Sequence, residues 1–109
     1  MNSAKQKSKI AFNQQAPTYD CDIKGQHART LYPVIINRLK SISYQTALDL
    51  GCGTGEVMKL ILQQDNSKIL YGLDLSEKML EIAQKKLENR ATLILGVLSH
   101  VWIRCHVHF

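Results

Sequence analysis

Apolar residues follow two different periods along the chain, and the change comes at about residue 45. Over residues 27–42 they recur at steps of three and four, which predicts one stripe of a helix, formed by Ala28, Leu31, Ile35, Leu39 and Ile42. Pro33 lies inside this stripe, so we expect a kink or a restart of the helix there. Residues 10–19 predict a shorter element interrupted at Pro17, and the polar residues 1–9 before it predict a mobile start.

From residue 46 onward, short apolar runs alternate with helical patterns. The runs predict strands over residues 46–50, 68–74 and 91–95. The patterns between them predict a helix over residues 56–64 and another from a cap at Ser76 to residues 89–90. This order of strands and helices builds a parallel sheet with helices on its faces, so we predict the α/β class.

The composition fits one small domain. With 109 residues, 45% of them hydrophobic and 21% charged, the chain is too short for two domains and is not biased like a disordered protein. Its apolar runs are shorter than the roughly 20 residues that cross a bilayer, so we expect no membrane partner. Its three cysteines are an odd, scattered set without an export signal, which favours reduced thiols and a cytoplasmic location.

The net charge of +5 belongs to the first 45 residues, which hold seven basic and two acidic groups, whereas residues 46–109 hold seven of each. A basic segment can bind nucleic acid, or it can be a solvated terminus. No aromatic cluster accompanies these lysines for base stacking, so we favour the solvated terminus over a nucleic-acid partner.

A glycine-rich loop lies where the first predicted strand meets the next helix. Gly51, Gly53 and Gly55 alternate there, which allows positive φ angles, close approach of a ligand and free amides at the helix start. Nineteen residues after Gly55, Asp74 ends the second strand, where a carboxylate can accept hydrogen bonds from both hydroxyls of a ribose. Both features fall at the carboxyl end of the sheet, where such folds bind their ligands.

The spacing of this loop excludes two common nucleotide sites. A nicotinamide fingerprint needs glycine at its first, third and sixth places, and the sixth place here is Glu56 or Met58. A phosphate-binding loop would end in Gly-Lys-Ser or Gly-Lys-Thr, which is absent from the sequence. The carboxylate of Glu56 at the helix start would repel pyrophosphate, so we expect a ligand without phosphate and with a positive centre.

These motifs resemble those of a known family. Residues 47–55 resemble the first motif of class I S-adenosylmethionine-dependent methyltransferases, residues 72–83 resemble the second, and residues 12–20 are similar to the preamble of members that act on small molecules. The resemblance covers roughly residues 12–96. It implies a Rossmann-like, doubly wound parallel sheet with strand order 3-2-1, S-adenosylmethionine as cofactor, and methyl transfer to a small-molecule acceptor.

The resemblance also implies roles for single residues, each with a simpler alternative. Asp49 would hold the ammonium group of the cofactor, or be satisfied by nearby amides. Asp74 would hold the ribose, or cap the following helix. The three loop glycines would pass close to the methionine part of the cofactor, or only form a tight turn. Leu75 would pack near the adenine and Tyr19 would cover the cofactor, or both would be ordinary packing residues.

The family pattern stops after Gly96, because no carboxylate follows the third strand to bracket the adenine. We therefore interpret residues 1–45 as a basic helical leader, 46–96 as the cofactor-binding half of a methyltransferase domain, truncated or frameshifted after Gly96, and 97–109 as an atypical tail. No catalytic residue is predicted. The alternative function is an inactive S-adenosylmethionine-binding fragment or a subunit that depends on a partner.

The tail alternates apolar and polar residues over positions 101–109. It is either an antiparallel strand on the third strand or, as we favour, the product of a shifted reading frame. If the tail is a strand on the third strand, the first strand keeps an unpaired edge that allows self-association. His106 and His108, with Cys105, match no standard zinc spacing, so we predict no metal site.

Overall fold

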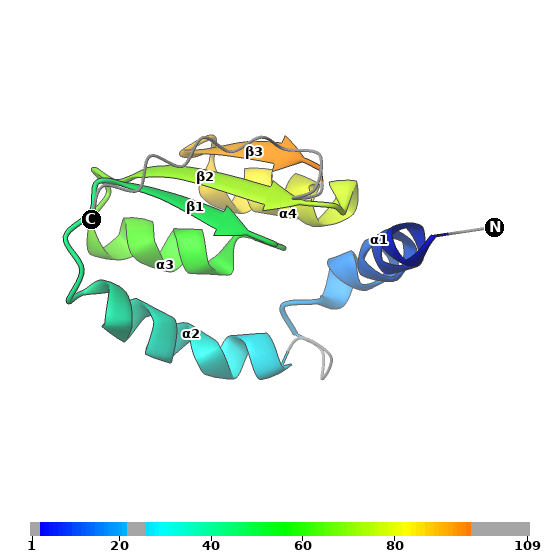
Figure 1. Ribbon diagram of the computed structural model, residues 1–109, viewed down its shortest axis with the longest axis horizontal. Coiled ribbons are helices and arrows are strands. Elements are labelled where there is room, and N and C mark those ends of the chain that lie inside the picture. Colours follow the sequence, from blue (N-terminus) through cyan, green and yellow to red (C-terminus); the bar gives the residue numbers. More distant parts are fainter. Residues whose placement is uncertain (1–2, 22–25, 97–109) are drawn as a thin grey trace.

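Three parallel strands form the centre of the molecule (Figure 1): β1 (Thr46–Leu50), β2 (Ile69–Asp74) and β3 (Ala91–Leu95). The structure is a computed structural model that describes residues 3–21 and 26–96. β2 lies between the other two strands, and the register pairs Leu50 with Leu73 and Asp74 with Leu95. The three strands therefore end at the same edge of the sheet.

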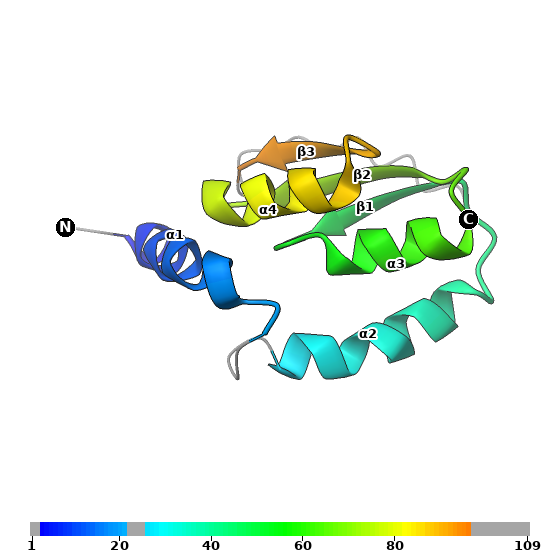
Figure 2. The ribbon, with the colours of Figure 1, turned by 180° about the vertical axis from the view of Figure 1, so that it is seen from behind.

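Two helices pack on one face of the sheet, α3 (Glu56–Gln64) and α4 (Glu77–Leu87). α2 (Gln26–Leu39) packs against α3 and forms an outer layer, as both views of the ribbon show (Figures 1 and 2). α1 (Ala4–Gln15) continues into a short 3-10 turn, η1 (Ala16–Thr18), and both lie against α4 beyond the carboxyl ends of the strands. Within the described ranges, helices cover only this face of the sheet.

The buried core lies between the sheet and the helices α3 and α4. Along β2, Leu70 and Gly72 are buried on this side, whereas Ile69 and Tyr71 point to the open side and are exposed. A Cβ atom added at Gly72 would lie 2.7 Å from Cε of Met58 and 2.9 Å from Sγ of Cys52. Glycine at this position thus lets α3 and the loop before it approach the sheet closely.

The predicted α/β class, the parallel sheet and the strand order are confirmed. The start of the chain differs from its prediction. α1 begins at Ala4, because Ser3 and Gln6 form a capping box in which each side chain accepts a hydrogen bond from the other backbone amide. The mobile start predicted for residues 1–9 is therefore wrong for the helical residues 4–9.

α2 also differs from its prediction. It passes through Pro33 as one helix, so the restart expected there is wrong. It ends at Leu39 rather than at Ile42, because Ser41 and Ile42 donate their amide hydrogens to carbonyls three residues earlier and form a turn. Every helix in residues 3–21 and 26–96 is too short or too polar to cross a bilayer. The strand considered for residues 101–109 lies outside the described residues.

Candidate functional site

The glycine loop connects β1 to α3 and lies on the end of β2. Gly51, Gly53 and Gly55 have φ angles of +69°, +55° and +81°, in the left-handed region that favours glycine. The amides of Gly51 and Cys52 both donate to the carbonyl oxygen of Leu73, at 2.7 and 2.9 Å. These bonds hold the loop at the carboxyl edge of the sheet.

Asp74 joins this loop to the start of α4. Its Oδ2 accepts a hydrogen bond from the amide of Gly53 at 2.8 Å, and its Oδ1 accepts one from the amide of Ser76 at 2.9 Å. The cap of α4 itself is Ser76, whose Oγ accepts from the amide of Met79 at 3.2 Å. A carboxylate oxygen has a second lone pair, so both oxygens of Asp74 can still accept hydrogen bonds from a ligand.

Asp49 has a different environment. Its side chain is half-buried near the end of β1, and burial, followed by the charge of Asp74, raises the pKa of Asp49 to about 6. In the described part of the chain no hydrogen bond reaches its carboxylate, so no described amide satisfies it. Burial and the same two carboxylates raise the pKa of Cys52 to about 12, so this thiol stays protonated and is no nucleophile.

An open cavity of about 290 Å³ lies at the carboxyl ends of the strands. Five of the seven predicted site residues line it: Tyr19, Gly51, Gly53, Asp74 and Leu75. The cavity is also lined by five residues that were not predicted from the sequence: Phe12, Leu50, Leu73, Met79 and Gly96. The cavity therefore combines residues from α1, the turn after η1, the glycine loop and the ends of all three strands.

Two predicted residues, Asp49 and Gly55, do not line this cavity. A Cβ added at Gly55 would lie 3.0 Å from Cδ1 of Leu87 and 3.1 Å from Cβ of Ala83, so Gly55 lets α4 pack against the loop. A Cβ at Gly51 or Gly53 would meet no protein atom within 4 Å. Only these two glycines therefore leave space on the cavity side of the loop.

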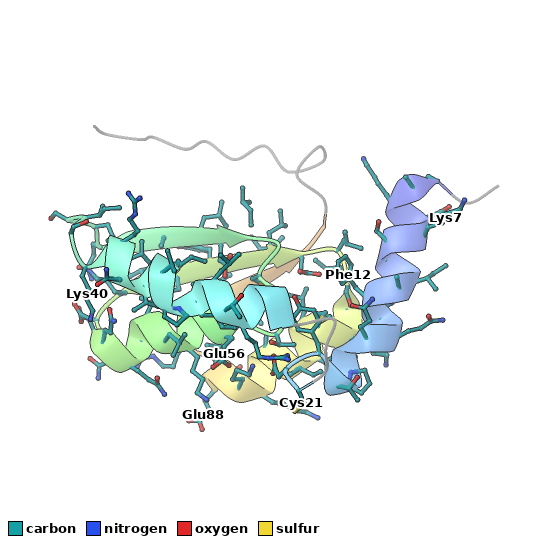
Figure 3. All side chains as sticks on the ribbon, turned by 90° about the horizontal axis from the view of Figure 1, so that it is seen from below. Lys7, Phe12, Cys21, Lys40, Glu56 and Glu88 are labelled. Atoms are coloured by element: carbon teal, nitrogen blue, oxygen red, sulfur yellow. The ribbon has the colours of Figure 1, made fainter. Side chains whose placement is uncertain are left out.

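The five lining residues that were not predicted from the sequence belong to different sequence patterns. Phe12 belongs to residues 12–20, which resemble the family preamble, and it lies on the side of α1 that faces the sheet (Figure 3). Gly96 directly follows β3, and its amide donates to the carbonyl oxygen of Asp74 at 3.0 Å. Leu50, Leu73 and Met79 fit the periodicity of core residues, which cannot distinguish a core wall from a cavity wall.

Glu56 forms an ion pair with Lys86, which corrects the prediction that its charge repels pyrophosphate. Its Oε2 lies 2.9 Å from Nζ of Lys86, and it is not among the residues that line the cavity. A partner lysine therefore offsets the charge that was expected to repel pyrophosphate. In residues 3–21 and 26–96, no three metal-ligating side chains come together, and His106, His108 and Cys105 lie outside these ranges.

A comparison with known families decides what kind of domain this is. Residues 47–103, which are 57 of the 109 residues, match the family described as a methyltransferase domain. The chain belongs to this methyltransferase family. Its class I membership and its α/β fold agree with the motifs at residues 47–55 and 72–83, and the cofactor of the family is S-adenosylmethionine, as predicted.

Relatives of the methyltransferase chain agree with this assignment. A malonyl-[acyl-carrier protein] O-methyltransferase of Priestia megaterium is 34% identical over an alignment of 105 residues that covers 91% of this chain and 37% of that protein. An S-adenosylmethionine-dependent methyltransferase of Geobacter sulfurreducens, solved with S-adenosyl-L-homocysteine, is 26% identical with a TM-score of 0.51, covering 60% of this chain and 28% of that one.

The structure of DhpI with SAH shares the fold, with a TM-score of 0.61 at 18% identity, over 83% of this chain and 44% of that chain. The methyltransferase chain thus spans less than half the length of each of these three proteins.

Proposed function

We propose that the cavity binds S-adenosylmethionine and that the whole protein transfers its methyl group to a small molecule. The carboxylate of Asp74 carries this proposal, because two backbone amides hold it rigidly on the cavity wall. Its remaining lone pairs suit the two hydroxyls of the cofactor ribose.

The other residues fit the rest of the cofactor. The space beside Gly51 and Gly53 accepts the methionine part, and the negative charge of Asp49 nearby favours its ammonium group. Leu75 offers an apolar surface to the adenine, and Tyr19 covers the site from the leader side. Bound S-adenosylmethionine supplies a methyl group already activated on a sulfonium, so the task of the protein is to hold it in line with the acceptor.

The acceptor and the partners belong to the same proposal. The likeness of residues 12–20 to preambles of small-molecule methyltransferases, and the open cavity beside them, support a small acceptor. The odd number of cysteines supports a reducing, cytoplasmic setting. Among the described strands β1 pairs only with β2, which supports self-association through its other edge.

Calorimetric titration with S-adenosyl-L-homocysteine tests the cofactor site. We expect micromolar binding, no binding of a nicotinamide dinucleotide, and a loss of about tenfold or more in affinity for Asp74→Asn, which removes one carboxylate acceptor. Glu81→Gln is the matched control, because it changes an exposed carboxylate of α4 that does not line the cavity. Wild-type affinity in Asp74→Asn would contradict the proposed site.

A further inference from the structure

A cluster of charged side chains joins three separate parts of the chain behind the cavity. Nζ of Lys86 on α4 lies 2.6 Å from Oδ2 of Asp20, 2.9 Å from Oε2 of Glu56 and 3.2 Å from Oγ1 of Thr54. The hydroxyl of Thr54 in turn donates to Oδ1 of Asp20 at 2.5 Å. One ammonium group therefore connects the turn after η1, the glycine loop and the first turn of α3.

The cluster is poorly exposed to solvent. The side chain of Lys86 is 15% exposed and Thr54 is 2% exposed. Burial opposes the ionisation of Asp20, but hydrogen bonds from Lys86 and Thr54 outweigh it and lower the pKa of this carboxyl. Without Lys86, the carboxylates of Asp20 and Glu56 would share one partly buried site with no ammonium between them, which is strongly unfavourable.

None of these four side chains lines the cavity, but Tyr19, the neighbour of Asp20, does. The guanidinium of Arg29 also holds this turn, because its Nη1 donates to the carbonyl oxygen of Tyr19 at 2.8 Å. Figure 3 shows the turn at Cys21 and the side chain of Glu56 on the same side of the molecule.

The other wall residue of the leader has its own tether. Phe12 is followed by Asn13, whose Oδ1 accepts from the hydroxyl of Ser76 at 2.5 Å. The two leader residues on the cavity wall, Phe12 and Tyr19, are thus each held in place by the polar residue that follows them.

We propose that Lys86 is a positioning residue for the cavity, which acts by holding residues 16–21 against the glycine loop and so keeps Tyr19 on the cavity wall. In this arrangement Lys86 touches no ligand. It affects the affinity of the cavity for the cofactor through Asp20. The inference rests on the proposed cofactor site, but the position of the turn can be tested without any ligand.

Hydrogen exchange of the ligand-free protein tests the position of the turn. The amides of Tyr19 and Cys21 donate to the carbonyls of Ala16 and Thr18, so residues 16–21 carry protected hydrogens that report on opening. We expect Lys86→Met to raise exchange in this segment about tenfold and to leave β2 unchanged. Lys86→Arg keeps the charge and should restore most of the protection.

Lys85→Met is the matched control, because Lys85 is the exposed neighbour on the same helix and takes no part in the cluster. Unchanged exchange in Lys86→Met, or equal exchange in Lys85→Met, would overturn the proposal.

Titration with S-adenosyl-L-homocysteine tests the effect on the cavity. Affinity should fall about tenfold in Lys86→Met and in Asp20→Asn, and the double variant should lose little more, because both changes break one contact. Asp20→Asn changes a residue of the leader and leaves Lys86 paired with Glu56, so it keeps the test decisive if Lys86→Met does not fold. Faster exchange with unchanged affinity would overturn the positioning role. A wild-type chain that binds no S-adenosyl-L-homocysteine would overturn the proposed function, and exchange would still decide whether Lys86 holds the turn.

Discussion

Two aspartates at the ends of neighbouring strands have opposite relations to the fold. At the end of β2, both carboxylate oxygens of Asp74 accept hydrogen bonds from backbone amides, those of Gly53 and Ser76. The carboxylate of Asp49, near the end of β1, accepts no hydrogen bond from the described residues, and burial together with the charge of Asp74 raises its pKa to about 6. The same residue type at the same edge of the sheet therefore stabilises the fold in one strand and opposes it in the other.

The two aspartates illustrate two reasons why a protein can keep a residue in a binding site. The protein itself uses the carboxylate of Asp74, so the fold would need this residue even without a ligand. It does not use the charge of Asp49, which a positively charged ligand alone would offset. In the proposed cofactor site, Asp74 thus serves both structure and binding, whereas Asp49 serves binding at a cost in stability.

The largest effect is expected from Asp74→Ala. The change leaves the amides of Gly53 and Ser76 without their acceptor, so the free energy of unfolding should fall by about 2 kcal/mol. The affinity for S-adenosyl-L-homocysteine should fall about 100-fold, because the ribose loses both of its acceptors and the loop loses its anchor. Urea denaturation and calorimetric titration measure the two losses.

Glu81→Ala provides the comparison for Asp74→Ala, since Glu81 is an exposed carboxylate on α4 whose Lys78 partner is also exposed. It should change the free energy of unfolding by less than about 0.5 kcal/mol. Equal losses in the two variants would mean that the amides of Gly53 and Ser76 do not depend on Asp74.

A smaller effect of opposite sign is expected from Asp49→Asn. The substitution removes a charge that the fold holds unfavourably, so at pH 7.5 the free energy of unfolding should rise by about 1–2 kcal/mol. The affinity for S-adenosyl-L-homocysteine should fall about tenfold, because the ligand ammonium loses its counter-charge. Thermal unfolding with and without ligand measures both changes. If Asp49→Asn were less stable than the wild type at pH 7.5, the charge of Asp49 would not destabilise the fold. The contrast drawn between Asp49 and Asp74 would then be refuted.

Much of the fold and part of the site could be predicted from the sequence, for a common physical reason. Short apolar runs, a Ser76 cap and alternating glycines are local signals, and local backbone preferences dictated the strands, α3 and α4 in the structure. Asp74 and Gly53 could be placed together because the ends of adjacent parallel strands must meet at one edge.

The rest depends on contacts between distant segments, which periodicity does not encode. Lys86 reads as a helix-terminal lysine in the sequence, yet it contacts Asp20, which lies 66 positions away. Gly55 reads as part of a ligand loop, yet its packing partners are Leu87 and Ala83 on α4. The capping box of Ser3 and Gln6 is a local pattern, but the prediction for residues 1–9 rested on their polar composition alone.

The smallest effect concerns the difference in the free energy of unfolding between the wild type and Asp49→Asn, which should depend on pH. Because folding raises the pKa of Asp49 from 3.8 to about 6, the folded state binds the proton more tightly, and its ionised form destabilises the fold. The stability advantage of Asp49→Asn should therefore be near zero at pH 4, grow as the pH rises to about 6, and stay constant above pH 7. Chemical denaturation at half-unit steps of pH, in both proteins, measures this curve.

The other titrating groups are the same in the wild type and in Asp49→Asn. Their contributions therefore cancel in the difference in the free energy of unfolding. The affinity of the wild type for S-adenosyl-L-homocysteine should rise by less than about tenfold between pH 5 and pH 7, as Asp49 ionises, and that of Asp49→Asn should stay flat. A stability difference that does not vary between pH 4 and pH 7 would show that Asp49 ionises at its ordinary pKa. The two aspartates would then differ in their hydrogen bonds alone, and the cost in stability assigned to Asp49 would be refuted.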